Sequence, residues 1–142
     1  MTTVAEVLSK KPRPFNYIEP NALVSDALSL LRSVNLSYLV VMHENEFKGI
    51  FSEHNYIDKI AMDGWDAHTC RVADSMRNDM PFVSLEDCIE TCVQLCIAHN
   101  IHHLPVFDDF RFAGVITRGD IMRTIVDKGS AAVEKKKVER VR

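Results

Sequence analysis

The chain repeats itself, and this repeat limits its fold more than any other feature of the sequence. A shift of 65 residues aligns residues 17–60 with residues 82–125 without a gap, so that Asn35 meets Asn100. Upstream, residues 3–8 resemble a second short segment at a shift of 68. A unit of about 60 residues buries little surface when it folds alone. Repeats of this size therefore usually share one core, and we expect two similar units that fold as a pair.

Each repeat is predicted to have the order β-α-β-β-α. Apolar residues recur at helical spacing in residues 24–34, and two short apolar runs with a polar turn between them follow, as in a hairpin. A final helix closes each repeat, and Gly129 is expected to end the second one. The expected helices are 24–34, 53–62, 89–99 and 118–127, and the expected strands are 15–18, 38–42, 47–51, 82–84, 103–107 and 112–116. The fold class is α/β, with tandem β-α-β-β-α repeats packed as a pseudo-two-fold pair.

We expect the first repeat at 1–64, a linker at 65–71, the second repeat at 72–129 and a basic C-terminal tail at 130–142. The last twelve residues hold five Lys or Arg and two Glu. A basic tail on an acidic body is either a solvated helix extension or an interaction arm. Both interpretations stay open at this point.

The composition excludes several classes of protein. The chain has 142 residues, is 46% hydrophobic and carries a net charge of −3, which is typical of a folded globular protein and gives no nucleic-acid footprint. No apolar run approaches the roughly 20 residues that span a bilayer. The N-terminus lacks the apolar stretch of a secretory signal. Four cysteines are too few for a disulfide scaffold, so a reducing cytoplasm is the predicted compartment.

The junction between the last strand and the last helix of the second repeat is the most informative local motif. Thr117 is followed three residues later by Asp120. A hydroxyl and a carboxylate at this spacing form a helix cap. The same groups suit a nucleotide, because a helix N-terminus attracts phosphate and a carboxylate accepts both hydroxyls of a ribose. The motif alone does not choose between these interpretations.

With these segments the chain resembles the CBS (cystathionine-beta-synthase) domain pair. The resemblance rests on the doubled unit, on Ile-His-His-Leu-Pro-Val at 101–106 and on Gly-Val-Ile-Thr-x-x-Asp at 114–120, and it covers roughly residues 3–128. The chain looks most like short stand-alone members that have one pair and no catalytic domain. The resemblance implies a cleft between the repeats that takes AMP, ATP or a related adenosyl compound, and a sensor or regulatory role.

The resemblance also implies which residues bind the ligand. Asp120 would bind the ribose, Thr117 would supply a hydroxyl, and the second half would place basic groups near phosphate. The implied site residues are Phe15, Asn16, Leu36 and Ser37 for the adenine wall, His102 and Arg118 for the phosphate, and Thr117 and Asp120. The related site in the first half departs from the family pattern, because Asn55 stands where the family usually has Asp. We expect one competent site and one weakened or empty site.

Three cysteines at helical spacing, Cys88, Cys92 and Cys96, resemble a metal or redox cluster. Their partners in the first repeat are Leu23, Ala27 and Leu31, which are all apolar. We therefore predict that these cysteines belong to the core, where Cys behaves as a small hydrophobe. Cys70, in the linker, is the cysteine that we expect to be exposed.

Three histidines, His99, His102 and His103, lie close together in the sequence. The last two flank a strand start, where neighbouring side chains point to opposite faces. No second cluster with metal-ligand spacing accompanies them. We predict no metal site, and a structural role for His103.

We predict a non-catalytic, cytoplasmic regulatory protein with no required cofactor, which binds an adenine nucleotide. The sequence contains no Walker motif, no G-x-S-x-G elbow and no H-E-x-x-H. We expect a homodimer, a regulated partner that the sequence does not identify, and no membrane. One alternative is an oligomerisation or scaffold module with no functional ligand site. Another is single-stranded nucleic-acid binding through residues 131–142, which the acidic body disfavours.

Overall fold

The structure is a computed structural model that describes residues 2–11 and 16–141, with the side chains of 60–62 and 130–141 left out. The chain divides into two compact units. Unit 1 contains Met1–Lys11 and Pro81–Arg142, and unit 2 contains Pro12–Met80. Among the described residues no helix is both long enough and apolar enough to cross a membrane.

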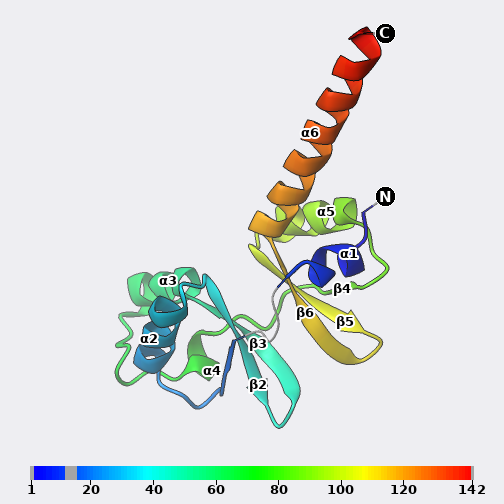
Figure 1. The fold of residues 1–142 in the computed structure, drawn as a ribbon. Helices are drawn as coiled ribbons and strands as arrows, with labels where there is room; N and C mark the ends of the chain where they lie inside the picture. Colours follow the sequence, from blue (N-terminus) through cyan, green and yellow to red (C-terminus); the bar gives the residue numbers. More distant parts are fainter. Residues whose placement is uncertain (1, 12–15, 142) are drawn as a thin grey trace. The chain divides into compact units, whose positions relative to one another are not determined.

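Unit 2 contains one three-stranded sheet in the order β1-β2-β3 (Figure 1). β1 pairs in parallel with β2, and β2 pairs antiparallel with β3. α2 lies between β1 and β2 in the chain, as the apolar spacing predicted. The elements are β1 (Tyr17–Ile18), α2 (Val24–Val34), β2 (Tyr38–His43), β3 (Glu46–Ser52), α3 (Glu53–Asp63) and α4 (Val72–Ser75).

Unit 1 repeats this sheet in the order β4-β5-β6. β4 is parallel to β5, and β5 is antiparallel to β6. The elements are α1 (Val4–Ser9), β4 (Val83–Ser84), α5 (Ile89–His99), β5 (His103–Asp108), β6 (Arg111–Thr117) and α6 (Arg118–Val141). The predicted fold class, with two β-α-β-β-α repeats, is therefore confirmed.

The two repeats agree in backbone detail. Val41 pairs with Gly49 in one hairpin and Val106 with Gly114 in the other, and both ladders shift register directly after this pair. α2 and α5 each end at an asparagine in the left-handed region, a conformation that Asn adopts at a helix C-terminus more readily than most residues. The repeat in the sequence is therefore a repeat in structure down to single residues.

The two short helices exchange places between the repeats. α1 precedes the first repeat in the chain but belongs to unit 1, where Val4 N–H donates to the Asp87 carbonyl at 2.8 Å. α4 precedes the second repeat but belongs to unit 2, where Val72 N–H donates to the Ala22 carbonyl at 2.9 Å. Each sheet is thus completed by the short helix that precedes the other repeat.

The burial of the cysteines tests two of the predictions about the core. Cys92 and Cys96 are 0% and 4% exposed, which confirms the core prediction for these two, and burial raises the pKa of Cys92 to about 12. Cys88 precedes the first turn of α5 and is only half-buried, so the prediction was wrong for this residue. The prediction that Cys70 is exposed was wrong, because its residue is only 8% exposed. Its carbonyl accepts a hydrogen bond from the Val24 N–H at the start of α2, and its N–H donates to the Asp66 carbonyl within the linker. The linker therefore packs against the core of unit 2.

The last helix is longer than predicted. We expected Gly129 to end it, but α6 continues through Gly129 to Val141. A glycine inside a helix costs only about 1 kcal/mol relative to alanine. The sequence after Gly129 is rich in Ala, Glu, Lys and Arg, which are good helix formers and offset this cost.

Candidate functional site

The junction between β6 and α6 holds a reciprocal helix cap. The Thr117 hydroxyl oxygen accepts a hydrogen bond from the Asp120 backbone N–H at 3.0 Å. In return, Asp120 Oδ2 accepts from the Thr117 backbone N–H at 2.9 Å. This is the capping-box arrangement, which satisfies two backbone donors at the start of the helix. The structure therefore gives both side chains a structural role, whatever else they do.

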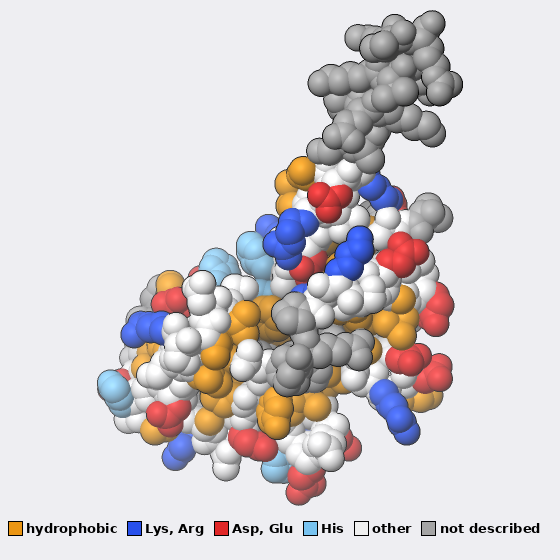
Figure 2. Space-filling model, viewed as in Figure 1, with side chains coloured by type: hydrophobic (Ala, Val, Ile, Leu, Met, Phe, Trp, Pro, Cys, Tyr) orange, Lys and Arg blue, Asp and Glu red, His pale blue; other side chains and the backbone are white. Residues whose placement is uncertain are grey.

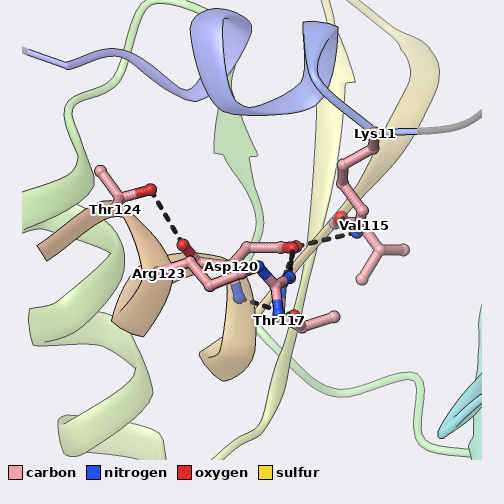
Figure 3. Close-up of polar contacts among 6 residues, drawn as sticks. All are labelled: Lys11, Val115, Thr117, Asp120, Arg123 and Thr124. Carbon is pink, nitrogen blue, oxygen red and sulfur yellow. Dashed lines mark hydrogen bonds and ion pairs between the residues drawn. The ribbon is translucent and has the colours of Figure 1, made fainter. Parts of the chain in front are cut away.

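The carboxylate of Asp120 is buried under two cations (Figure 3). Lys11 Nζ donates to Oδ2 at 2.8 Å, and Arg123 Nη2 donates to Oδ1 at 2.5 Å. The Asp120 side chain is 4% exposed, whereas the Lys11 and Arg123 side chains are 23% and 71% exposed. Asp120 is thus a buried carboxylate that holds one mostly buried and one mostly exposed partner.

These contacts keep the carboxylate ionised. Burial by itself raises the pKa of Asp120, but the hydrogen bonds from Lys11 and Thr117 and the charge of Lys11 outweigh it. The pKa of Asp120 is therefore lowered from its ordinary value of 3.8. A permanent negative charge at this position can accept hydrogen bonds from hydroxyl groups.

Lys11 is held in place by a second acceptor. Its Nζ also donates to the Val115 carbonyl of β6 at 2.7 Å. Its backbone N–H donates to the Leu8 carbonyl at 3.1 Å, which continues the end of α1. Sequence reasoning missed Lys11, because it lies 109 residues from Asp120 and only the packing of α1 in unit 1 brings the two together. It also missed Arg123, although the i, i+3 spacing to Asp120 is readable in the sequence.

The predicted phosphate-binding residues lie beside the cap. The Arg118 backbone N–H donates to the His102 carbonyl at 3.0 Å, and Arg118 Nε donates to the Ile101 carbonyl at 2.9 Å. His102 is exposed. Figure 2 shows Lys and Arg side chains gathered near the start of α6. The structure therefore brings four predicted site residues together in unit 1, namely His102, Thr117, Arg118 and Asp120.

His103, the neighbour of His102 at the start of β5, is neutral. Burial lowers its pKa to about 4, and the charges of His102, Lys11 and Arg118 act in the same direction. The imidazole is therefore uncharged at neutral pH. Among the residues that the structure describes, no group of three or more His, Cys, Asp or Glu could hold a metal ion.

The predicted adenine-wall residues belong to unit 2. Asn16 is half-buried, and its carbonyl accepts from Val40 N–H at 3.1 Å. Leu36 and Ser37 are exposed after the end of α2. Phe15 lies outside the described residues. Their assignment to the same ligand as Asp120 stays a prediction.

Unit 2 has a weaker version of the cap. Ser52 and Asn55 take the places of Thr117 and Asp120, and the Asn55 backbone N–H donates to Ser52 Oγ at 3.2 Å. Ser52 is 3% exposed, but Asn55 is only half-buried. Of the described residues of unit 2, no Asp or Glu is buried. The buried anion of unit 1 therefore has no counterpart there.

Comparisons with known proteins agree with this fold. A family model for the CBS domain matches residues 4–61 and 72–127. The mitochondrial CBS domain-containing protein CBSX3 of Arabidopsis thaliana is 28% identical over 134 residues, which cover 88% of this chain and 65% of that protein. The chain thus spans just under two thirds of that relative's length.

Solved structures show the same architecture. A putative signal-transduction protein with CBS domains from Burkholderia ambifaria MC40-6 has a TM-score of 0.83 and 28% identity, with 89% of this chain and 95% of that chain covered. CBSX2 in complex with AMP has a TM-score of 0.74 and 23% identity, with 91% and 99% covered. The CBS domain pair of MJ0100, in complex with 5′-methylthioadenosine and S-adenosyl-L-methionine, has a TM-score of 0.76 and 21% identity, with 90% and 98% covered.

Proposed function

Because the chain belongs to the CBS domain family, we propose that it is a regulatory module that binds an adenosyl ligand of the AMP or ATP kind and catalyses no reaction. The observation that carries this proposal is the buried, ionised carboxylate of Asp120 inside a helix cap and among cations. Ligand-bound CBS pairs of similar fold, with AMP in one and methylthioadenosine and S-adenosylmethionine in the other, support the ligand class.

The proposed binding mode uses the chemistry of the junction. The two ribose hydroxyls donate hydrogen bonds to the Asp120 carboxylate, which has about four acceptor positions. Because three of them are already used, one of the present donors has to leave. A phosphate lies near the N-terminus of α6, where backbone N–H groups and the helix dipole favour an anion. Arg118 and His102 are placed at this end of the helix and pair with the phosphate.

The remaining parts of the site come from the family resemblance. Phe15, Asn16, Leu36 and Ser37 form the adenine wall from the first repeat, and the ligand lies between the repeats. The site around Asn55 is the weaker of the two, because an amide brings no charge and one fewer acceptor oxygen. These assignments stay predictions.

Regulation follows if the ligand binds two conformations of the protein with unequal affinity. We propose a homodimer as the working form, in the cytoplasm. Its interface would use apolar helix faces that are exposed in the described chain. These include Val34 on α2, Ile57 on α3, Ile97 on α5, and Met122, Ile125 and Val126 on α6.

Thermal unfolding in the presence of AMP, ADP, ATP, NADH or S-adenosylmethionine tests the proposal, with calorimetry to confirm each shift. A ligand at about 100 times its Kd stabilises the folded protein by about 2.7 kcal/mol. We expect stabilisation of the wild type and of Asn55→Ala, and its loss in Asp120→Asn. Equal stabilisation of the wild type and Asp120→Asn would move the ligand away from Asp120.

The second candidate function is a scaffold module without a ligand. One observation favours it: the carboxylate of Asp120 already has three hydrogen-bond donors and is 4% exposed. A lack of binding for all five compounds by calorimetry would support the scaffold over the sensor.

A further inference from the structure

The cover over Asp120 limits how a ribose can reach it. Among the described residues, Oδ2 accepts from Lys11 Nζ and from the Thr117 N–H, whereas Oδ1 accepts from Arg123 Nη2 (Figure 3). A carboxylate has about four acceptor positions, two on each oxygen. Oδ2 is therefore full, and Oδ1 has one position left. A ribose diol that donates one hydrogen bond to each oxygen needs a place on Oδ2.

One of the two donors on Oδ2 must leave for such a diol. The Thr117 N–H belongs to the backbone and is fixed in the helix cap. Lys11 is a side chain that reaches Oδ2 from just after α1, and when it leaves Oδ2 it can keep its hydrogen bond to the Val115 carbonyl. Lys11 is therefore the donor that can move. When it moves, its ammonium loses an anionic partner inside a mostly buried environment, which is costly unless another anion replaces Asp120.

Lys11 lies where the chain passes from unit 1 to unit 2, so its movement affects the connection between the units. Lys11 is the last residue of unit 1 in the N-terminal part of the chain, and Pro12 is the first residue of unit 2. The backbone N–H groups of Lys10 and Lys11 donate to the carbonyls of Val7 and Leu8 and so form the end of α1. A change at Lys11 therefore acts on the point where the chain leaves one compact unit for the other.

We propose that Lys11 is an internal competitor for the ribose-binding carboxylate of Asp120, that the ligand displaces it, and that the site therefore selects adenosyl ligands that carry a phosphate. The inference rests on the proposed function, since it needs a ribose at Asp120. A phosphate supplies the anion that the displaced ammonium needs. An uncharged nucleoside has to break the ion pair and offers nothing in return.

Calorimetric titration with AMP and with adenosine, on the wild type and on Lys11→Met, tests this inference. In the wild type AMP binds more tightly than adenosine. In Lys11→Met the affinity for adenosine rises about tenfold, the effect of removing one competing charge-assisted hydrogen bond, and the preference for AMP falls. Lys10→Met is the matched control, because Lys10 is an exposed lysine at the same helix end. It leaves both affinities unchanged.

Arg123→Met distinguishes the two cations over Asp120. If this variant gains adenosine affinity and Lys11→Met does not, Arg123 is the group that is displaced and the inference is wrong. An unchanged ratio of AMP to adenosine affinity in Lys11→Met also overturns it, while binding in the wild type leaves the proposed function intact. If Lys11→Met binds adenosine and the other proteins do not, the inference is supported. No binding of either ligand by any variant overturns the proposed function and the inference with it.

Hydrogen exchange of the wild type provides a readout that does not depend on the stability of a variant. If AMP displaces Lys11, exchange at the amides of Lys10 and Lys11 becomes faster on binding, while most other amides of unit 1 become more protected. Greater protection of these two amides with AMP bound contradicts displacement.

Discussion

The two strand-to-helix junctions of this chain have the same backbone and opposite chemistry. In unit 1, Thr117 and Asp120 cap α6 reciprocally, and the buried carboxylate lies under Lys11 and Arg123. In unit 2, the described cap is one hydrogen bond, from the Asn55 N–H to Ser52 Oγ, and Asn55 brings no charge. The strand register and the position of the irregularity in each hairpin are nevertheless the same.

The charges around the two junctions differ in sign. In the alignment of the repeats, Lys11, Arg118 and Arg123 meet three acidic residues, Asp79, Glu53 and Asp58. In unit 1 the cations Lys11 and Arg123 pair with Asp120, whereas in unit 2 Asp79 pairs with Arg77 at 3.1 Å and Asp58 lies 3.8 Å from His54 Nε2. The two junctions therefore share one backbone arrangement but carry differently charged side chains, and within the described residues the ion pairs on a buried carboxylate belong to unit 1.

Removal of the buried carboxylate should give the largest difference in stability between matched variants of the two junctions. Asp120→Ala leaves the Lys11 ammonium without its anionic partner and removes half of the helix cap. We expect a loss of about 3 kcal/mol in the free energy of unfolding, measured with urea. Asn55→Ala, the matched change in unit 2, costs less than about 1 kcal/mol because the hydrogen bond from Asn55 to Ser52 Oγ is donated by the backbone N–H, which alanine keeps. Equal losses would show that the Lys11 pair contributes nothing to stability.

The two strand glycines should resist a methyl group for different reasons. A Cβ on Gly49 would lie 2.7 Å from the Arg77 carbonyl oxygen, which belongs to backbone paired with Ile50. At Gly114 the nearest atom, Leu8 Cδ2 at 3.1 Å, can move, but the φ of 158° is one that residues with a side chain rarely adopt. We expect Gly49→Ala to cost about 2–3 kcal/mol through the backbone contact and Gly114→Ala about 1–3 kcal/mol through backbone strain. Urea unfolding measures both costs, and a negligible loss in Gly114→Ala would show that its backbone relaxes out of this conformation.

Acidification should remove the contribution of the ionised Asp120 carboxylate to stability. The folded pKa of Asp120 is lowered from 3.8, so its ionised form stabilises the fold above that value, and this contribution is lost as the pH falls through the folded pKa. The stability difference between the wild type and Asp120→Asn should be constant above about pH 5 and shrink below 3.8. A difference that grows on acidification would mean that the folded pKa is raised.

The hairpin turns provide the smallest test. Glu44 and Asp109 both have positive φ, at 50° and 55°. Asp and Asn adopt this conformation more readily than Glu. Glu44→Asn should stabilise the protein by about 0.5 kcal/mol, whereas Asp109→Asn should leave it nearly unchanged. Differential scanning calorimetry of both variants measures the two effects, and no gain from Glu44→Asn would mean that the contact between Glu44 and His43 Nε2, at 3.7 Å, offsets the strain.

Much of the fold could be predicted from the sequence because the signals are local. Apolar spacing in 24–34 and the alignment of residues 17–60 with 82–125 indicated the elements and their repetition. The same alignment identified Cys92 and Cys96 as core residues, since Ala27 and Leu31 occupy their places. The cap between Thr117 and Asp120 was readable because its partners are three residues apart.

The features that sequence reasoning missed depend on contacts between distant segments. Nothing in residues 3–8 indicates which sheet α1 completes, so Lys11 could not be connected with Asp120. Cys70 was expected to be exposed, because the polar composition of its linker gives no sign of the backbone bonds to Asp66 and Val24. Gly129 indicated the end of a helix, but the helix formers that follow it decided the outcome.

The exchange of the short helices also sets an order of assembly. Unit 2 is one continuous stretch, Pro12–Met80, inserted into unit 1, whose two parts are separated by that stretch. During synthesis from the N-terminus, unit 2 is complete in the chain before β6 exists, whereas α1 must wait for the last strand of unit 1. Contacts between distant segments form slowly because the intervening loop must first close. The insertion therefore places the Lys11–Asp120 pair among the last contacts to form, and folding that starts with unit 2 shortens the loop that α1 has to close.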